Sequence, residues 1–322
     1  MKPILNITNG DSAVKTMREA GIPGIYLPWR DVLHEGPVPA GLSLEELSQI
    51  RAQFIANRGW ADRDVVAKDF AERDNTLVNY ADYSRVVLWF EHDLYDQLQL
   101  LQLLDWFAQH YQGEVPLKLI NVDQYLGVVS VNHMQHFMSL ARDVTDTHLN
   151  LARKAWAAYR SASPEAWQAL LNEDTTPLRF LHDAVYRQLE EYPNSRNGLS
   201  RTAQQALRII SEGESRPGRV FGAYQETEEK RFMGDASFWQ ILHEFLDSSP
   251  PLLKLPEGKK LTLPTSPDQT LSITLDGINV LLGRHNWLDI MSIDRWIGGV
   301  HLTPQHCWCW NPVTAQVELR SG

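Results

Sequence analysis

Cysteine is scarce in this chain of 322 residues, which has only Cys307 and Cys309. Two cysteines this close in sequence do not form an ordinary structural disulfide, and without a second pair they make no zinc motif. Long apolar runs are also absent, since none approaches the roughly 20 residues that a membrane span needs. The first ten residues become polar too early for a secretory signal. We therefore expect a cytoplasmic protein with no membrane partner.

An excess of basic residues is lacking as well. Acidic side chains outnumber basic ones by 40 to 30, which gives a net charge of −10 and a pI near 5.6. This balance disfavours a general attraction to nucleic-acid phosphates, although Lys254, Lys259 and Lys260 keep nucleic acid open as a partner. No glycine-rich fingerprint for a dinucleotide or for ATP is present. The oligomeric state has no signature in the sequence.

Short apolar segments alternate with longer amphipathic ones in the first half of the chain. We expect strands at Pro3–Thr8, Gly24–Leu27, Arg85–Phe90 and Leu117–Val122. This alternation predicts an α/β fold in which a mostly parallel, Rossmann-like sheet has helices on both faces. We assign residues 1–147 to this domain.

The second half of the chain is predominantly helical. Residues 148–195 are rich in Ala, Leu and aromatic residues and are expected to form a helical connector. Residues 196–322 begin with three expected helices, at Leu199–Glu212, Arg219–Lys230 and Asp235–Leu246, and a short two-stranded hairpin follows them. Three helices and such a hairpin predict a winged-helix-like C-terminal domain.

Residues that can carry chemistry follow the first three expected strands. Ligands of open parallel sheets bind beyond the carboxyl ends of the strands, so side chains at these ends are expected to meet at one edge. In chain order they are Asn9, Gly10, Asp11 and Ser12, then Trp29, Arg30, Asp31, His34 and Glu35, and then Glu91, His92 and Asp93.

We predict a catalytic role for the acidic and imidazole groups at this edge. His92 is the expected general acid or base, and Glu91 and Asp93 either orient it or hold a divalent metal ion. Asp11 supplies a further carboxylate. His34 and Glu35, in the loop after the second strand, are expected to close the site. The alternative is that Asp93 simply caps the following helix while Glu91 and His92 face water. The predicted catalytic set is Glu91, His92, Asp93, Asp11, His34 and Glu35.

The remaining residues at this edge are expected to bind a small anionic substrate. Arg30 can grip an anion in a bidentate fork, and Gly10 can provide a tight turn that exposes backbone N–H groups. The alternatives are an ion pair of Arg30 with Asp31 or with Glu35, and an ordinary capped helix after the turn. The predicted substrate-binding set is Asn9, Gly10, Ser12, Trp29, Arg30 and Asp31.

Three long segments resemble a bacterial family catalogued as domain of unknown function 1835. They are Leu5–Ser12, Leu27–Pro39 and Leu88–Gln97, all within the N-terminal third. Phe232–Asp235 and Ile293–Leu302 resemble the region that often accompanies that domain. The resemblance implies no particular reaction, so the argument from the strand ends stands on its own.

These patterns favour an enzyme of the hydrolase or group-transfer type, acting on a small anionic substrate such as a phosphorylated one. One alternative is a non-enzymatic regulator that senses a metabolite and uses the winged-helix-like domain to bind nucleic acid or a partner protein. Another is a scaffold whose helical middle mediates oligomerisation. A deep pocket that holds His34, Glu91 and His92 together would favour catalysis.

Overall fold

The computed structural model describes residues 2–262, 265–266 and 268–320 and divides the chain into two compact units. Unit 1 comprises Met1–Val185 together with Trp296–Val300. Unit 2 comprises Tyr186–Arg295 and His301–Gly322. Each unit is described by itself.

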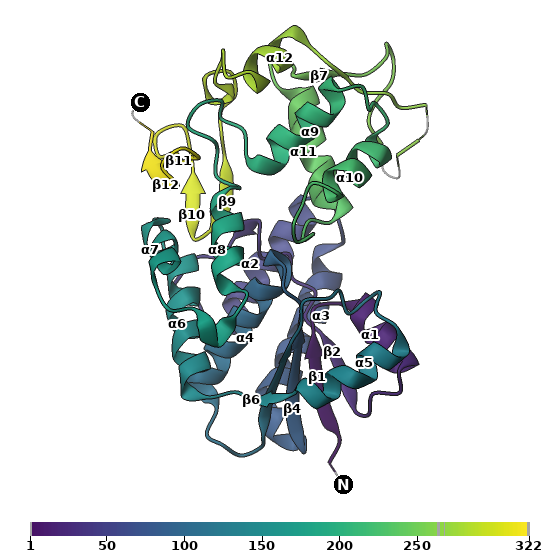
Figure 1. Ribbon diagram of the computed structural model, residues 1–322, viewed down its shortest axis with the longest axis vertical. Helices are drawn as coiled ribbons and strands as arrows, with labels where there is room; N and C mark the ends of the chain where they lie inside the picture. The colour runs from purple at the N-terminus through teal and green to yellow at the C-terminus, as the bar shows by residue number, and fades with distance from the viewer. Residues whose placement is uncertain (1, 263–264, 267, 321–322) are drawn as a thin grey trace. The chain divides into compact units, whose positions relative to one another are not determined.

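Unit 1 is built on a five-stranded sheet, seen edge-on in Figure 1. Its strands are β1 (Ile4–Thr8), β2 (Ile25–Pro28), β4 (Arg85–Phe90), β5 (Leu117–Asn121) and β6 (Arg142–Asp143), in the order β2-β1-β4-β5-β6. The first four are parallel and β6 is antiparallel to β5, which confirms the mostly parallel α/β fold. The chain runs outward from β1 to β2 and then returns past β1 to β4. The strand order therefore reverses between β1 and β4.

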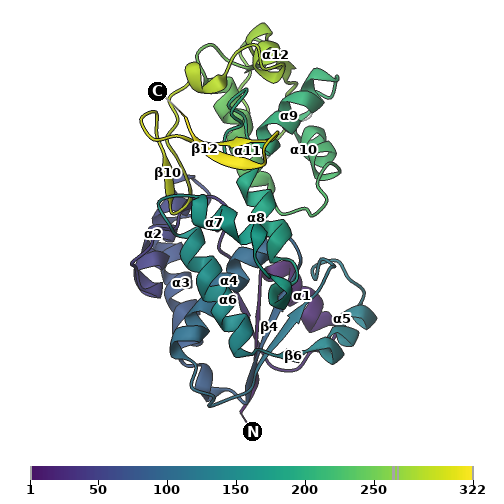
Figure 2. The same cartoon turned by 60° about the vertical axis from the view of Figure 1, so that its left-hand side comes forward.

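Helices cover both faces of this sheet (Figures 1 and 2). One face carries α1 (Asp11–Glu19) and α5 (Val131–Phe137), and the other carries α4 (Leu94–His110) and α6 (Asp146–Tyr159). Alternate residues of β4 point to opposite faces of the sheet. Because helices cover both faces, every residue of β4 after the first is apolar. The predicted helical cover on both faces is confirmed.

One side of the core shows how the layers hold together. Trp89 of β4 packs in one cluster with Met17 of α1 and Met134 of α5, and all three are almost fully buried. The indole Nε1 of Trp89 donates a 3.0 Å hydrogen bond to Oδ1 of Asn6, on the neighbouring strand β1. The central pair of strands is thus tied by side chains as well as by backbone.

The α2–α3 hairpin connects β2 with β4. Ser43 and Glu46, whose three-residue spacing is that of a capping box, form one at the start of α2 (Leu44–Asn57). Asp62 caps α3 (Arg63–Val78), which packs along α2. The 3-10 helix η1 (Tyr80–Asp82) then leads into β4.

The start of α1 corrects one prediction. Asp and Ser are common N-cap residues, so Asp11 or Ser12 is the expected cap of this helix, but Gly10 holds the position and makes no side-chain cap. Its φ of −169° is extended backbone that any residue adopts, and the space around it is open. The tight turn expected from a glycine here is therefore not present.

The end of unit 1 differs from the expected domain boundaries. Residues 148–185 belong to unit 1 rather than to a separate connector, because α6 packs along α4. Gly36 and Pro37, which form β3, pair in parallel with Ile297 and Gly298 of β9 (Arg295–Gly298). The remaining elements are η2 (Met138–Leu140), α7 (Glu165–Ala169), η3 (Leu170–Asn172), η4 (Thr176–Leu178) and α8 (Leu181–Leu189), whose last residues enter unit 2.

Unit 2 contains the three predicted helices. They are α9 (Arg201–Ser211), α10 (Pro217–Gln225) and α11 (Asp235–Asp247). Two antiparallel two-residue strands, β7 (Leu253–Lys254) and β8 (Ser272–Ile273), follow the helices, while residues 263–264 and 267 of the expected hairpin lie outside the described residues. The other elements are α12 (Leu275–Leu281), η5 (Trp287–Asp289), β10 (Val300–Leu302), β11 (Trp308–Asn311) and β12 (Gln316–Leu319).

No helix in the described ranges combines the length and the apolar character that crossing a membrane requires.

Candidate active site

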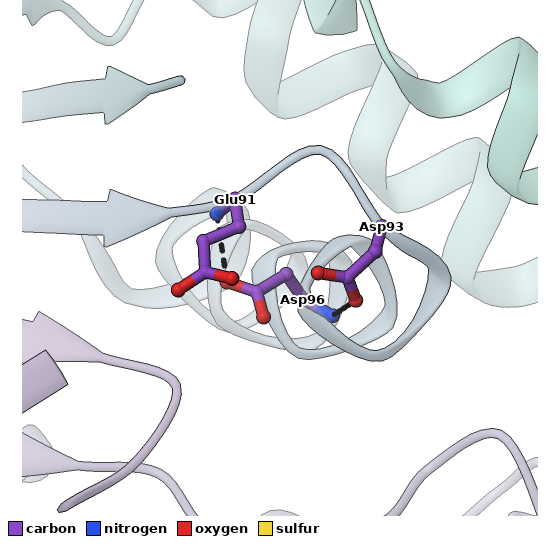
Figure 3. Close-up of side chains that lie close together, drawn as sticks. All are labelled: Glu91, Asp93 and Asp96. Atoms are coloured by element: carbon purple, nitrogen blue, oxygen red, sulfur yellow. Dashed lines mark hydrogen bonds between the residues drawn. The ribbon is translucent and has the colours of Figure 1, made fainter. Parts of the chain in front are cut away.

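Three buried carboxylates meet just beyond the end of β4 (Figure 3). Glu91, Asp93 and Asp96 each place a carboxylate oxygen within 4.8 Å of the others. Their exposed fractions are 4%, 3% and 1%. We call Glu91, Asp93 and Asp96 the carboxylate triad.

The N-terminus of α4 brings the triad together. Asp93 is the N-cap and accepts a 3.2 Å hydrogen bond from the backbone N–H of Asp96. In turn, Oδ1 of Asp96 accepts a 2.7 Å hydrogen bond from the backbone N–H of Glu91. A three-residue spacing in a first helical turn places both aspartates at the same helix end. The capping alternative for Asp93 is thus correct, and it coexists with the cluster.

Asn9 at the end of β1 joins the triad from a second strand. Its Nδ2 donates to Oε1 of Glu91 at 3.1 Å and to Oδ2 of Asp96 at 2.8 Å. The backbone N–H of Leu126, beyond β5, donates to the same Glu91 oxygen at 2.7 Å. The site therefore lies at the β1–β4 reversal of strand order, where ligands of doubly wound sheets bind.

The electrostatics of the triad are unfavourable without a cation. Burial, and then the charge of Asp93, raises the pKa of Glu91 to about 8. Burial, and then the charges of Asp93 and Glu91, raises the pKa of Asp96 well above its ordinary value. The hydrogen-bond donors to Glu91 and Asp96 are neutral amides, and neither residue forms an ion pair in the described part of the chain.

The triad offers oxygen donors of the kind that hard divalent cations take. Mg²⁺, Mn²⁺ and Ca²⁺ are held by carboxylate and carbonyl oxygens. A bound divalent charge would favour the ionised form of each acid and oppose the repulsion that raises their pKa values. Proton donation by Glu91 is the other chemistry that the arrangement permits, because a carboxyl with a pKa near 8 is mostly protonated at neutral pH.

His92 lies between two members of the triad in the sequence, and its side chain is 8% exposed. Its ring packs against Tyr125, with centroids 5.0 Å apart, and against Phe180 at 5.8 Å. The alternative in which His92 and Glu91 face water is wrong, since both are buried. His92 thus sits in an aromatic slot next to the carboxylates.

Asp11 and Arg30 form an exposed ion pair at the same edge. The guanidinium donates from Nε at 2.8 Å and from Nη2 at 2.7 Å to the two carboxylate oxygens. The hydrogen bond from Arg30 lowers the pKa of the Asp11 carboxyl. Arg30 also has a φ of 58°, a left-handed conformation that is uncommon outside glycine. Arg30 therefore forms a bidentate ion pair within the chain, and its partner is Asp11 rather than Asp31 or Glu35.

Asp31 and Trp29 serve the core at this point of the chain. Asp31 is fully buried and accepts a 3.0 Å hydrogen bond from Nε of Arg51. The indole of Trp29 is also fully buried and donates to Gln102 at 2.7 Å. The Asp31 carboxylate does not support its predicted substrate role, because it is already paired with a buried cation.

His34 and Glu35 lie in the loop after β2. Nε2 of His34 is 3.9 Å from Oε1 of Glu35, whose other oxygen is 3.5 Å from Arg58. The His34 ring is buried and meets the ring of Tyr95 edge-on, with centroids 6.1 Å apart. Tyr95 stands between Asp93 and Asp96 in the first turn of α4, so this loop reaches the element that carries the triad.

Ser12 is exposed in the first turn of α1 and lies next to Gly127, in the loop that follows β5. A Cβ on Gly127 would come within 2.9 Å of Ser12 Cβ, so the two segments are in close contact. Ser12 makes no hydrogen bond to the triad among the described residues, whereas Asn9 does. Of the two polar side chains that flank Gly10 and Asp11, only Asn9 is brought into the site.

Asp96 and Tyr95 were not among the predicted site residues. The argument from strand ends does not reach Asp96, which lies three positions after the helix cap Asp93. The sequence does carry a signal for Asp96, because the Asp-x-x-Asp spacing at the start of a helix places both acids in its first turn.

Comparison of the chain with protein-family models and with curated protein sequences finds no match.

Proposed function

We propose that unit 1 is the catalytic part of an enzyme of the hydrolase or group-transfer type. Its substrate is a small anionic molecule, with a phosphorylated compound as the first candidate. The observation that carries this proposal is the carboxylate triad, buried at the reversal of strand order and joined there by Asn9. Capping of α4 needs Asp93 alone, and perturbed acids that gather at the ligand-binding edge of a sheet are typical of functional sites.

A divalent cation on the triad supplies what an acidic site lacks for an anionic substrate. Glu91, Asp93 and Asp96 would hold it, and the cation would offset the negative charge of substrate and protein together. His92, in its aromatic slot, is the proposed proton donor or acceptor. Arg30 is the proposed anion contact, and binding there has to compete with Asp11.

The test is a screen of the full chain against phosphate esters, nucleotides and amides, with Mg²⁺ or Mn²⁺ and separately with EDTA. Activity should require the cation, and Glu91→Gln and His92→Ala should each lower it at least tenfold. Asp64→Asn is the matched control, since that acid on α3 is exposed and does not belong to the triad. Two results together would contradict the enzymatic proposal. One is a screen that detects no activity, and the other is ligand-induced thermal stabilisation that is the same in the wild type and in His92→Ala.

Unit 2 fits a winged-helix-like arrangement, which we include in the proposal. The support is the succession of α9, α10 and α11 followed by the antiparallel pair of β7 and β8. The third helix has no Lys or Arg between Asp235 and Asp247, whereas DNA-reading helices present such side chains. We therefore assign α11 to contacts with protein rather than with DNA. If the full chain retarded duplex DNA in a gel-shift assay at physiological salt, the result would favour a non-enzymatic regulator that binds nucleic acid.

The family resemblance and the cytoplasmic location are also part of the proposal, and the sequence patterns described above support them. The resemblance to the bacterial family described above covers the strand ends that form the site, including Asn9 and the triad. A cytoplasmic location fits the state of Cys307 and Cys309, which are free and buried.

A further inference from the structure

A cavity of about 370 Å³ is lined by residues of α2 and by the second half of α4, where α4 packs along α6 (Figure 2). Its volume falls within the range of roughly 300–1,000 Å³ that is usual for small-molecule sites. Asp105, in its wall, lies about 13 Å further along the α4 axis than Asp96. No member of the carboxylate triad lines the cavity, so it is a separate site.

The wall carries two opposite charges that do not neutralise each other. Asp105 and Arg160 both line the cavity and are half-buried. They form no ion pair with each other or with any other described residue. Burial raises the pKa of the Asp105 carboxyl and lowers the pKa of the Arg160 guanidinium. Each group would therefore gain from an oppositely charged partner in the cavity.

Both charged groups keep atoms that a ligand can use. Oδ2 of Asp105 accepts a 2.8 Å hydrogen bond from Gln109, whereas Oδ1 accepts none from the described residues. Nε and Nη2 of Arg160 donate to the backbone oxygen of Pro39, and Nη2 also donates to that of Leu42. These bonds hold the guanidinium in place and leave Nη1 without an acceptor in the described chain. The site is thus preorganised, which lowers the entropic cost of binding.

Gln102 adds a buried donor to the same wall. It is only 3% exposed and lines the cavity. Its Oε1 accepts a 2.7 Å hydrogen bond from the indole of Trp29, but its Nε2 donates to no described residue. Buried polar groups almost always have a hydrogen-bond partner, so this amide nitrogen indicates an acceptor inside the cavity.

We propose that this cavity binds a free α-amino acid with an aliphatic side chain. The ammonium group donates to Asp105, and the carboxylate accepts from Nη1 of Arg160 and Nε2 of Gln102. The aliphatic side chain lies against Leu42 and Leu44, which are half-buried in the cavity wall. A ligand with one charge of each sign pairs both wall charges, whereas a ligand with a single charge leaves one of them unpaired. Because the triad lies elsewhere on α4, this site does not depend on the proposed function.

Three related ligands provide the test. L-leucine carries both charged groups, isocaproate lacks the ammonium group, and isoamylamine lacks the carboxylate. Isothermal titration of the full chain in EDTA should show saturable binding of L-leucine and at least tenfold weaker binding of each analogue. EDTA keeps the titration independent of any cation on the triad.

Two variants test the two charges separately. Asp105→Asn should weaken L-leucine at least tenfold and leave isocaproate unchanged, because only the ammonium contact loses its charge. Arg160→Lys should weaken L-leucine and isocaproate and leave isoamylamine unchanged, because lysine lacks the planar fork. Asp64→Asn is the matched control and should bind L-leucine as the wild type does, since that exposed acid does not line the cavity.

Three outcomes would overturn the proposal: no saturable binding of L-leucine, binding of either analogue as tight as that of L-leucine, or unchanged L-leucine binding in Asp105→Asn. A titration of the same chain with Mn²⁺ separates this site from the triad. Failure of L-leucine binding with intact cation binding contradicts the amino-acid site alone. L-leucine binding without cation binding contradicts the proposed function alone.

Discussion

Replacing Glu91 with Gln removes one buried negative charge and keeps the length of the side chain. The remaining carbonyl oxygen can still accept from the backbone N–H of Leu126 and from Asn9. In the cation-free wild-type chain, Glu91 has a pKa of about 8, against an ordinary value of 4.5. A group whose pKa is raised by folding makes the folded state bind more protons. The free energy of unfolding therefore falls as the pH rises from 4.5 to about 8, the interval between the two pKa values.

The size of the effect follows from the same pKa values. A tenfold change in proton affinity corresponds to ~1.4 kcal/mol, so ionising Glu91 at pH 8 costs the folded state at most about 4 kcal/mol. Glu91→Gln should recover part of this cost. We expect the variant to be more stable than the wild type by about 1–3 kcal/mol at pH 8 without a cation, and to show little difference at pH 4.5.

The assay is chemical denaturation of the full chain from pH 4.5 to 8.5 in EDTA, combined with hydrogen exchange of the β1 and β4 amides. The exchange measurement assigns the change to unit 1, since the chain has two compact units. Asp64→Gln is the control, because its carboxylate is exposed and lies outside the triad. A variant that is less stable than the wild type at pH 8, or one that keeps the full pH dependence, would refute the reasoning.

Substitutions at three further positions test the surroundings of the triad. Asp31→Ala leaves the buried Arg51 guanidinium without its carboxylate, so we expect a loss of about 3–5 kcal/mol in chemical denaturation; a loss below 1 kcal/mol would contradict the buried ion pair. Asn9→Ala removes one donor from two buried acceptors and should cost about 1–3 kcal/mol by the same assay, with no loss as the contrary result. Arg30→Gly should be more stable than Arg30→Ala by about 1 kcal/mol, because glycine accepts the φ of 58° without strain. Equal melting of these two variants would show that no strain is stored there.

Local sequence patterns were sufficient for the framework of unit 1. The run Arg85–Phe90 is apolar at five of its six positions, and the strand has these bounds because both faces of the sheet are covered. Ser43 and Glu46 gave the start of α2 because a capping box depends on residues close in sequence. The strand-end argument also placed Asn9 and Glu91 together correctly, since parallel strands share one carboxyl edge.

Contacts between distant segments could not be derived in this way. Gly36 pairs with Ile297 across most of the chain, and two-residue strands carry too little pattern to predict a partner. Arg30 could pair with any nearby acid, and the structure selects Asp11 because Asp31 turns inward to Arg51. Such choices depend on which way each loop side chain turns, and residue spacing does not determine this.

Cation binding by the triad is most directly measured by isothermal titration of the full chain with Mn²⁺ at pH 7.5, in two buffers of different ionisation enthalpy. The wild type should bind one ion per chain and release protons, because Glu91, with its pKa of about 8, must lose its proton to serve as a ligand. Glu91→Gln should lose both the binding and the proton release, whereas Asp64→Asn should keep them. No saturable heat in the wild type, or the same heat from Glu91→Gln, would contradict the account.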